Sequence, residues 1–146
     1  MKRASRWMWI GLAVYVVSWF IQVEKDGITL SDGNLPGWQA LRLALEPIWR
    51  TSSEPLEGSL IWQILSVLSG LSNLVVPLSL VWIAGANGGE SMRRLARMLL
   101  LAGLINLQWL RSAPDLRAGY YCWAVAFWVL GFAALQRAKA MAKPAP

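Results

Sequence analysis

Residues 59–84, which read SLIWQILSVLSGLSNLVVPLSLVWIA, decide the fold of this chain. This stretch contains no Asp, Glu, Lys or Arg. A helix needs about 20 predominantly apolar residues to cross the hydrocarbon core of a bilayer, so this one can cross with some tilt. Pro77 lies inside the stretch, and a kink is therefore expected near Asn73, four residues earlier. The sequence here predicts a kinked transmembrane helix.

Three further apolar runs accompany this helix and cover residues 7–23, 95–110 and 119–136. Charged residues make up only 15% of the chain, against about 25% in ordinary soluble domains, and they cluster between the runs. The first run reads as an uncleaved signal anchor, because no small-residue cleavage site follows it. The sequence therefore predicts an all-α membrane protein, a four-transmembrane-helix bundle that forms one domain over residues 1–146.

The basic residues indicate how such a bundle is oriented. Segments 1–6, 85–97 and 137–146 would lie on one side of the bilayer and hold nine Lys and Arg residues, whereas the other side holds five. Because Lys and Arg accumulate in cytoplasmic loops, both termini are predicted to be cytoplasmic. The formal charge of +6 does not indicate a nucleic-acid partner, since the basic residues flank apolar runs and form no basic helix face.

The loop of residues 24–58 is the largest predicted outer segment. Its Asp32-Gly33 pair is a turn signal that allows a short hairpin. Residues 36–46 predict an amphipathic helix that Pro47 should end or bend. This helix either caps the bundle or lies on the outer leaflet of the bilayer. Its apolar side consists of Trp38, Leu41 and Leu45, and its polar side includes Arg42 and Glu46.

A stripe of small and polar residues runs along the central helix at alternating four- and three-residue spacings. Helices in lipid associate through such residues, which allow close packing and hydrogen bonds between helices. The stripe could instead line a polar cavity. Packing is the favoured interpretation, because polar residues between membrane helices usually only form hydrogen bonds to the neighbouring helix. Such bonds contribute about 0.6 kcal/mol on average, and the residues that make them need have no further function. The candidate residues are Gln63, Ser66, Gly70, Asn73 and Pro77, joined by Asn106 from the third run.

The sequence provides little for catalysis or for a cofactor. It contains no His, and its one cysteine, Cys122, lies inside an apolar run. This composition removes the usual general base, the usual metal ligand and any disulfide within the chain. No charged residue lies deep in any apolar run, which argues against ion-coupled transport. We therefore predict no catalytic, cofactor-binding or metal-binding residues.

Three short stretches carry a resemblance to a known group of proteins. They are Ser18-Trp-Phe20, Leu35-Pro-Gly-Trp38 and Gly119-Tyr-Tyr-Cys-Trp123. With these stretches the chain resembles a loose group of small uncharacterised bacterial inner-membrane proteins with four spans. The resemblance implies a multi-pass protein of the bacterial cytoplasmic membrane and brings no activity with it.

The first functional hypothesis is a non-catalytic accessory subunit, an interaction partner of another membrane protein or of a second copy of the chain. Trp123, Phe127 and Trp128 offer a possible docking face, because aromatic side chains anchor interfaces. Contact of these rings with lipid is the alternative interpretation.

Two other function classes remain open from the sequence. An oligomeric passive pore or small-molecule carrier could be built around Asn73, Pro77 and Asn106. A membrane enzyme would have to use acidic residues of the outer segments, such as Glu46 or Asp115, and it ranks third.

Overall fold

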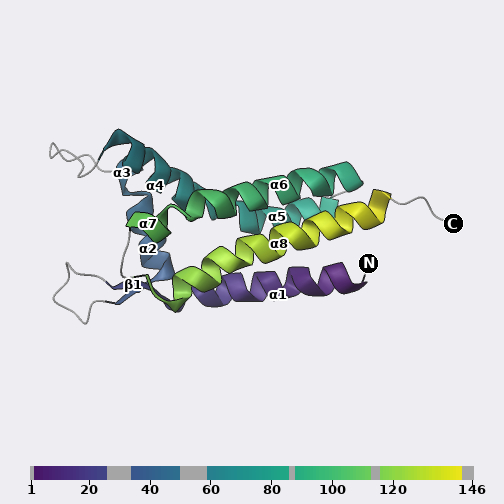
Figure 1. Ribbon diagram of the computed structural model, residues 1–146, viewed down its shortest axis with the longest axis horizontal. Helices are drawn as coiled ribbons and strands as arrows, with labels where there is room; N and C mark the ends of the chain where they lie inside the picture. Colours follow the sequence, from purple (N-terminus) through teal and green to yellow (C-terminus); the bar gives the residue numbers. More distant parts are fainter. Residues whose placement is uncertain (1, 26–33, 50–58, 86–87, 113–115, 143–146) are drawn as a thin grey trace.

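The computed structural model describes residues 2–25, 34–49, 59–85, 88–112 and 116–142. The described chain is mostly helical. Its long helical segments run alternately in opposite directions, and the two ends of the chain lie at the same end of the molecule (Figure 1). This end is called the terminal end below, and the opposite end, where β1 and α2 lie, is called the far end.

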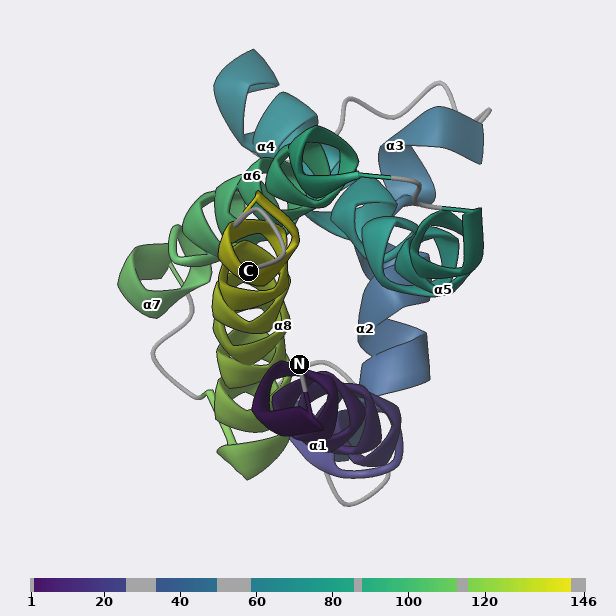
Figure 2. The same ribbon diagram turned by 90° about the vertical axis from the view of Figure 1, so that its right-hand side faces the viewer.

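Three long helices form the tightly packed part of the molecule: α1 (Lys2–Ser18), α6 (Gly89–Asn106) and α8 (Ala118–Ala142). α8 packs along both of the others and lies between them when the bundle is viewed from the terminal end (Figure 2). The run predicted over residues 119–136 thus extends to Ala142.

Glycines allow these helices to approach closely. A Cβ placed on Gly11 of α1 would lie 2.8 Å from Cγ of Leu130, and one on Gly131 of α8 would lie 2.7 Å from Cδ2 of Leu100. Real Cβ atoms do not come so near to other side chains, so these contacts need glycine. Small residues have this role at the contacts between membrane helices.

The central apolar stretch forms two helices, α4 (Leu60–Ser72) and α5 (Val75–Gly85), with a break between them. The kink predicted near Asn73 is therefore confirmed. Pro77 has no N–H, so the carbonyl of Asn73 lacks its helical donor. The hydroxyl of Tyr15 lies 3.0 Å from that carbonyl oxygen and 3.1 Å from Oδ1 of Asn73, so its single proton is shared between the two acceptors and replaces the missing bond only in part.

The far end contains a small two-stranded sheet, which the all-α fold class omits but which lies where the sequence allowed a short hairpin. β1 (Gln22–Lys25) and β2 (Asn34–Pro36) are antiparallel, with Lys25 opposite Asn34. The predicted Asp32-Gly33 turn lies outside the described residues. The prediction of a helix over residues 7–23 is wrong at its end, because α1 stops at Ser18 and the chain then turns into β1.

The predicted amphipathic helix is present in two pieces. α2 (Gly37–Ala44) and α3 (Glu46–Trp49) are separated at Leu45, and Pro47 lies in the first turn of α3. Proline fits that position because the first turn of a helix does not use its N–H groups. The bend expected at Pro47 therefore lies two residues earlier.

The third predicted run, residues 95–110, is shifted in the structure. α6 begins at Gly89, and a separate short helix, α7 (Trp109–Ser112), follows its end at Asn106. The first turns of α6 are polar, with Glu90 contacting Arg93 and Arg94 at 3.8 and 3.7 Å. Hydropathy locates only the apolar part of a helix, so it could not find this beginning.

Within the described part of the chain, two stretches are long and apolar enough to cross a membrane, Leu60–Ile83 and Ala118–Ala142, as judged by length and composition. Core helices of soluble proteins can meet the same test, but those are mostly buried. In the first stretch only 28% of the apolar window is buried, and in the second 50%.

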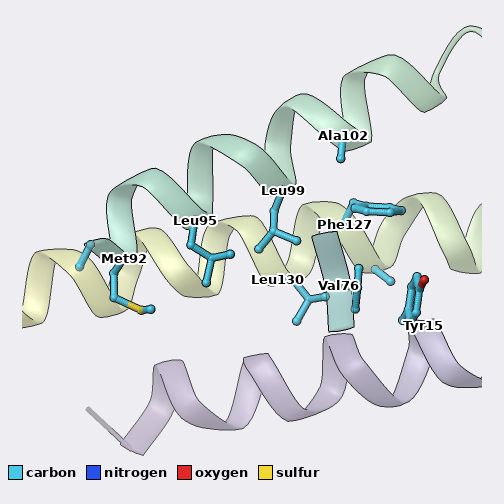
Figure 3. Close-up of a cluster of buried hydrophobic side chains, with 10 residues drawn as sticks. Tyr15, Val76, Met92, Leu95, Leu99, Ala102, Phe127 and Leu130 are labelled. Carbon is cyan, nitrogen blue, oxygen red and sulfur yellow. The ribbon is translucent and has the colours of Figure 1, made fainter. Parts of the chain in front are cut away.

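A buried apolar cluster fills the bundle from the terminal end toward its middle (Figure 3). α1, α5, α6 and α8 contribute to it, and each side chain is less than a tenth exposed. The labelled members are Tyr15, Val76, Met92, Leu95, Leu99, Ala102, Phe127 and Leu130. The far half of the bundle contains polar side chains and a cavity instead.

Candidate functional site

Asn73, at the break between α4 and α5, is the centre of a buried hydrogen-bond network. Its Oδ1 accepts from the hydroxyl of Tyr15 at 3.1 Å and from Nε1 of Trp123 at 2.7 Å. Its Nδ2 donates to the carbonyls of Ser69 and Gly70, each at 3.3 Å. One amide therefore connects α1 and α8 to the interrupted helix.

Asn106, at the end of α6, is fully buried and has a similar role. Its Oδ1 accepts from Oγ of Ser69 at 2.6 Å, and its Nδ2 donates to Oγ of Ser72 at 3.0 Å. The last carbonyls of a helix have no partner inside the helix. The hydroxyl of Tyr120 donates to the carbonyl of Asn106 at 2.6 Å, so α8 caps α6 here.

The network continues to the short helices at the far end. Nε1 of Trp109, on α7, donates to Oγ of Ser69 at 2.8 Å. Oγ of Ser66 donates to the carbonyl of Ala44, the last residue of α2, at 3.1 Å. The serines of α4 therefore hold α7 on one side and α2 on the other.

A cavity of about 260 Å³ lies next to this network and is partly open to the surface. α1, α2, α4, α7 and α8 all contribute to its walls, and none of the described residues that line it is charged. The lining consists of Ser18, Trp19, Gly37, Ala40, Leu41, Leu43, Ala44, Ser66, Ser69, Gly70, Asn73, Trp109, Leu116, Tyr120 and Trp123.

Helix α2 packs on the far end of the bundle, as in the first of the two positions that the sequence allowed. Leu41 and Ala44 line the cavity, and Leu45 packs on α4 at Gly70. A Cβ on Gly70 would lie 2.5 Å from Cδ2 of Leu45, so a larger residue at this position would force the Leu45 side chain to shift. Trp38, Arg42 and Leu43 remain exposed on α2.

The three stretches behind the resemblance meet beside the cavity. A Cβ on Gly37 would lie 2.9 Å from the carbonyl oxygen of Ser18, and one on Gly119 would lie 2.6 Å from that of Gln22. These neighbours are backbone atoms, which cannot move aside as the end of a side chain can. Glycine at both positions therefore allows the segments after α1, before α2 and at the start of α8 to touch.

The structure brings together four of the six predicted packing or cavity residues. Ser66, Gly70 and Asn73 line the cavity, and Asn106 accepts a hydrogen bond from the lining residue Ser69. Gln63 is half-buried and Pro77 is exposed, and neither belongs to the lining. Pro77 acts on the site indirectly, through the Asn73 carbonyl that it leaves without a helical donor.

The predicted docking face of Trp123, Phe127 and Trp128 is wrong. Phe127 is fully buried in the core, and Trp123 is half-buried and bonded to Asn73. Trp128 is half-buried against α6, where a Cβ on Gly103 would lie 3.2 Å from its ring. These rings pack the bundle, and they present no common surface.

Sequence reasoning missed four aromatic residues of the site: Tyr15, Trp19, Trp109 and Tyr120. For Tyr15 the sequence did contain a signal, Pro77, because the carbonyl that proline leaves without its helical partner needs another hydrogen-bond donor. The proline could not indicate which side chain supplies that donor.

The site has no arrangement typical of catalysis. Cys122 is the one cysteine of the chain and is half-buried. Within the described ranges, no group of three or more His, Cys, Asp and Glu residues could hold a metal ion. The observed chemistry is hydrogen bonding and enclosure of space.

Comparison with protein-family models, with curated proteins and with solved structures finds no match to this chain. The function must therefore be argued from the geometry of the site.

Proposed function

We propose that the chain is an integral membrane protein in which α1, α4–α5, α6 and α8 each cross the bilayer. At 1.5 Å per residue α1 and α6 are about 25 and 27 Å long, close to the roughly 30 Å hydrocarbon core. Large apolar side chains on all four segments are more than 40% exposed, a surface that suits lipid and is rare on soluble monomers. Examples are Val17, Leu68, Val81, Leu101 and Phe132.

In this proposal the terminal end is cytoplasmic and the cavity faces outward. Among the described residues, Arg6, Arg137 and the arginines at the start of α6 lie toward the terminal end. Lys25, Arg42 and Arg111 belong to β1, α2 and α7 at the far end, and Arg117 directly precedes α8 there. The positive-inside rule supports this orientation. The cytoplasmic membrane of a bacterium remains the proposed location.

The proposed activity is non-catalytic binding of a small molecule in the outward cavity. The observation that carries it is a partly open cavity at the far end, covered by α2, whose described lining residues are all uncharged. Binding sites for small molecules are typically concave and mostly apolar, with a few placed polar groups. Leu99, Phe127 and Leu130 fill the bundle on the cytoplasmic side, which favours a closed binding site or carrier over an open pore.

The accessory-subunit hypothesis has a different surface in its favour. Leu60, Ile61 and Ile64 on α4 are 70%, 68% and 50% exposed, and α4 packs on its neighbours less extensively than α8 does. Another membrane protein, or a second copy of the chain, could cover this face. Affinity purification from native membranes in mild detergent tests this second candidate, which fails if no stoichiometric partner is recovered.

The binding function can be tested by thermal unfolding of the purified full chain against a panel of small molecules. Ala40→Phe fills the cavity from α2, whereas Ala13→Phe adds the same ring to the exposed side of α1 as a matched control. A ligand at 100 times its Kd stabilises by about 2.7 kcal/mol, which raises Tm by several degrees. The proposal predicts at least one compound that stabilises the native chain and Ala13→Phe but not Ala40→Phe.

Two results would count against this function. Equal stabilisation of all three proteins by every active compound would mean that the cavity binds none of them. A flux of neutral solutes through proteoliposomes that exceeds the rate of empty vesicles and does not saturate with solute concentration would instead indicate an open pore.

A further inference from the structure

The charge of the cavity lining restricts what can occupy it. None of the described lining residues is Asp, Glu, Lys or Arg, so an ion bound there would lose its hydration without gaining a counter-charge. Burial of an isolated ion is costly enough that an ionic ligand would not be held. The occupant should therefore be uncharged.

The polar groups of the lining are already used by the protein. Oδ1 of Asn73 accepts two hydrogen bonds and its Nδ2 donates two. Oγ of Ser69 accepts from Trp109 and donates to Asn106, and the hydroxyl of Tyr120 donates to the backbone of α6. The O–H groups of Ser69 and Tyr120 are thus committed as donors, so a ligand that needs a donor from them would have to break one of these bonds or leave its own acceptor unsatisfied.

Four aromatic side chains line the cavity: Trp19, Trp109, Tyr120 and Trp123. The ring centroids of Tyr120 and Trp123 are 5.8 Å apart. Tyr15 and Phe127 pack against Trp19 and Trp123, with centroids 5.9 and 5.5 Å apart, without lining the cavity themselves. Ala40, Leu41 and Leu43 of α2 belong to the same lining. Ring faces and leucine side chains together suit hydrocarbon.

The volume sets the size of the occupant. The cavity of about 260 Å³ corresponds to roughly nine atoms of the size of a water molecule, at about 30 Å³ for each water in the liquid. We propose that the site takes an uncharged hydrocarbon group of about nine or ten heavy atoms, either a small free molecule or the end of a lipid acyl chain. This inference rests on the proposed function, because it names the ligand class of the same cavity.

The test uses three probes of matched shape: naphthalene, 2-naphthol and 2-naphthoate. Their binding to the purified full chain is measured by tryptophan fluorescence and by the shift in Tm, after correction for partition into micelles. Trp19, Trp109 and Trp123 line the site and report on it directly. We expect naphthalene to bind at least tenfold more tightly than 2-naphthoate and more tightly than 2-naphthol, with Ala40→Phe losing this binding and Ala13→Phe retaining it.

The outcomes separate the ligand class from the binding function. Tighter binding of 2-naphthoate or 2-naphthol, still lost in Ala40→Phe, would overturn the hydrocarbon ligand and leave the binding function intact. Binding of all three probes that is indifferent to Ala40→Phe would overturn both. If Ala40→Phe does not fold, Leu41→Ala serves instead. Its larger cavity should bind anthracene more tightly than the native chain does, and equal or weaker binding of anthracene would overturn the proposal.

A second measurement distinguishes the two sources of hydrocarbon. In nanodiscs, phosphatidylcholine brominated near the end of its acyl chains quenches tryptophans that a chain end reaches. Quenching that falls in Ala40→Phe but not in Ala13→Phe supports a lipid chain as the natural occupant. Equal quenching in both, together with naphthalene binding in the same nanodiscs, supports a small free molecule.

Discussion

Replacement of Asn73 by leucine should destabilise the bundle through one specific atom, Nε1 of Trp123. Most partners of Asn73 keep another bond in the variant: Tyr15 still donates to the backbone carbonyl of residue 73, and the Ser69 carbonyl still accepts from Ser72. The Gly70 carbonyl still accepts from the backbone N–H of residue 73. The bond from Trp123, at 2.7 Å, has no such substitute among the described contacts.

The expected magnitude follows from that one lost partner. A buried donor left unsatisfied costs about 1–3 kcal/mol in soluble proteins, and hydrogen bonds between membrane helices average about 0.6 kcal/mol with a maximum near 1.7. The Trp123 bond is short and lies in the interior, so we expect the upper part of the membrane range, about 1–1.7 kcal/mol. Gln63→Leu, on the same helix but outside the lining, should leave stability unchanged or slightly raised.

Equilibrium unfolding of the purified full chain by SDS in mixed micelles measures these free energies. A double-mutant cycle isolates the bond, because Trp123→Phe removes the donor that Asn73→Leu leaves unpaired. The double variant should be more stable than the sum of the single effects by about 1 kcal/mol. Strictly additive effects, or an Asn73→Leu protein as stable as the native one, would refute the reasoning.

Three further predictions follow from the contacts. Gly119→Ala should lower Tm, because the added Cβ would lie 2.6 Å from the carbonyl oxygen of Gln22. Gly88→Ala should leave Tm unchanged, because a Cβ there meets nothing within 4 Å, and equal Tm values for the two variants would contradict the prediction. Tyr120→Phe should cost about 1 kcal/mol by losing its bond to the Asn106 carbonyl, and Tyr121→Phe, at an exposed position, should cost less in the same SDS titration. Glu90→Gln should change stability by less than about 0.5 kcal/mol, since its arginine contacts are exposed and long; a larger loss would mean that these pairs matter.

The sequence predicted those features that depend on chain length, apolar content or proline. Residues 59–84 indicated one helix with a kink near Asn73, and the structure has a break between two helices at that place. The polar stripe correctly singled out Asn73 and Asn106, because an amide inside an apolar bundle needs partners, and both amides have them.

The inward-facing aromatic residues could not be predicted in the same way. Helix α8 is apolar on its buried and exposed faces alike, so its sequence carries no amphipathic pattern that separates buried Phe127 from exposed Phe132. The beginning of α6 was not predicted for a related reason. Hydropathy identifies the apolar run, and the first turns of α6, around Glu90, are polar. The small sheet depends on pairing between β1 and β2, which no local pattern in either strand encodes.

The most direct test of the proposed four-span arrangement is cysteine labelling in intact bacterial cells that express the chain. In a Cys122→Ser background, single cysteines replace Glu90 and Ala140 near the terminal end, Ala118 near the far end, and Leu101 on the exposed apolar face of α6. The proposal predicts that a membrane-impermeant maleimide labels Ala118→Cys in intact cells. It should label Glu90→Cys and Ala140→Cys only after permeabilisation. Leu101→Cys should resist labelling in both conditions, because lipid covers it. The proposal would be contradicted if Leu101→Cys reacted as fast as Ala118→Cys in permeabilised cells. It would also be contradicted if Glu90→Cys were labelled in intact cells.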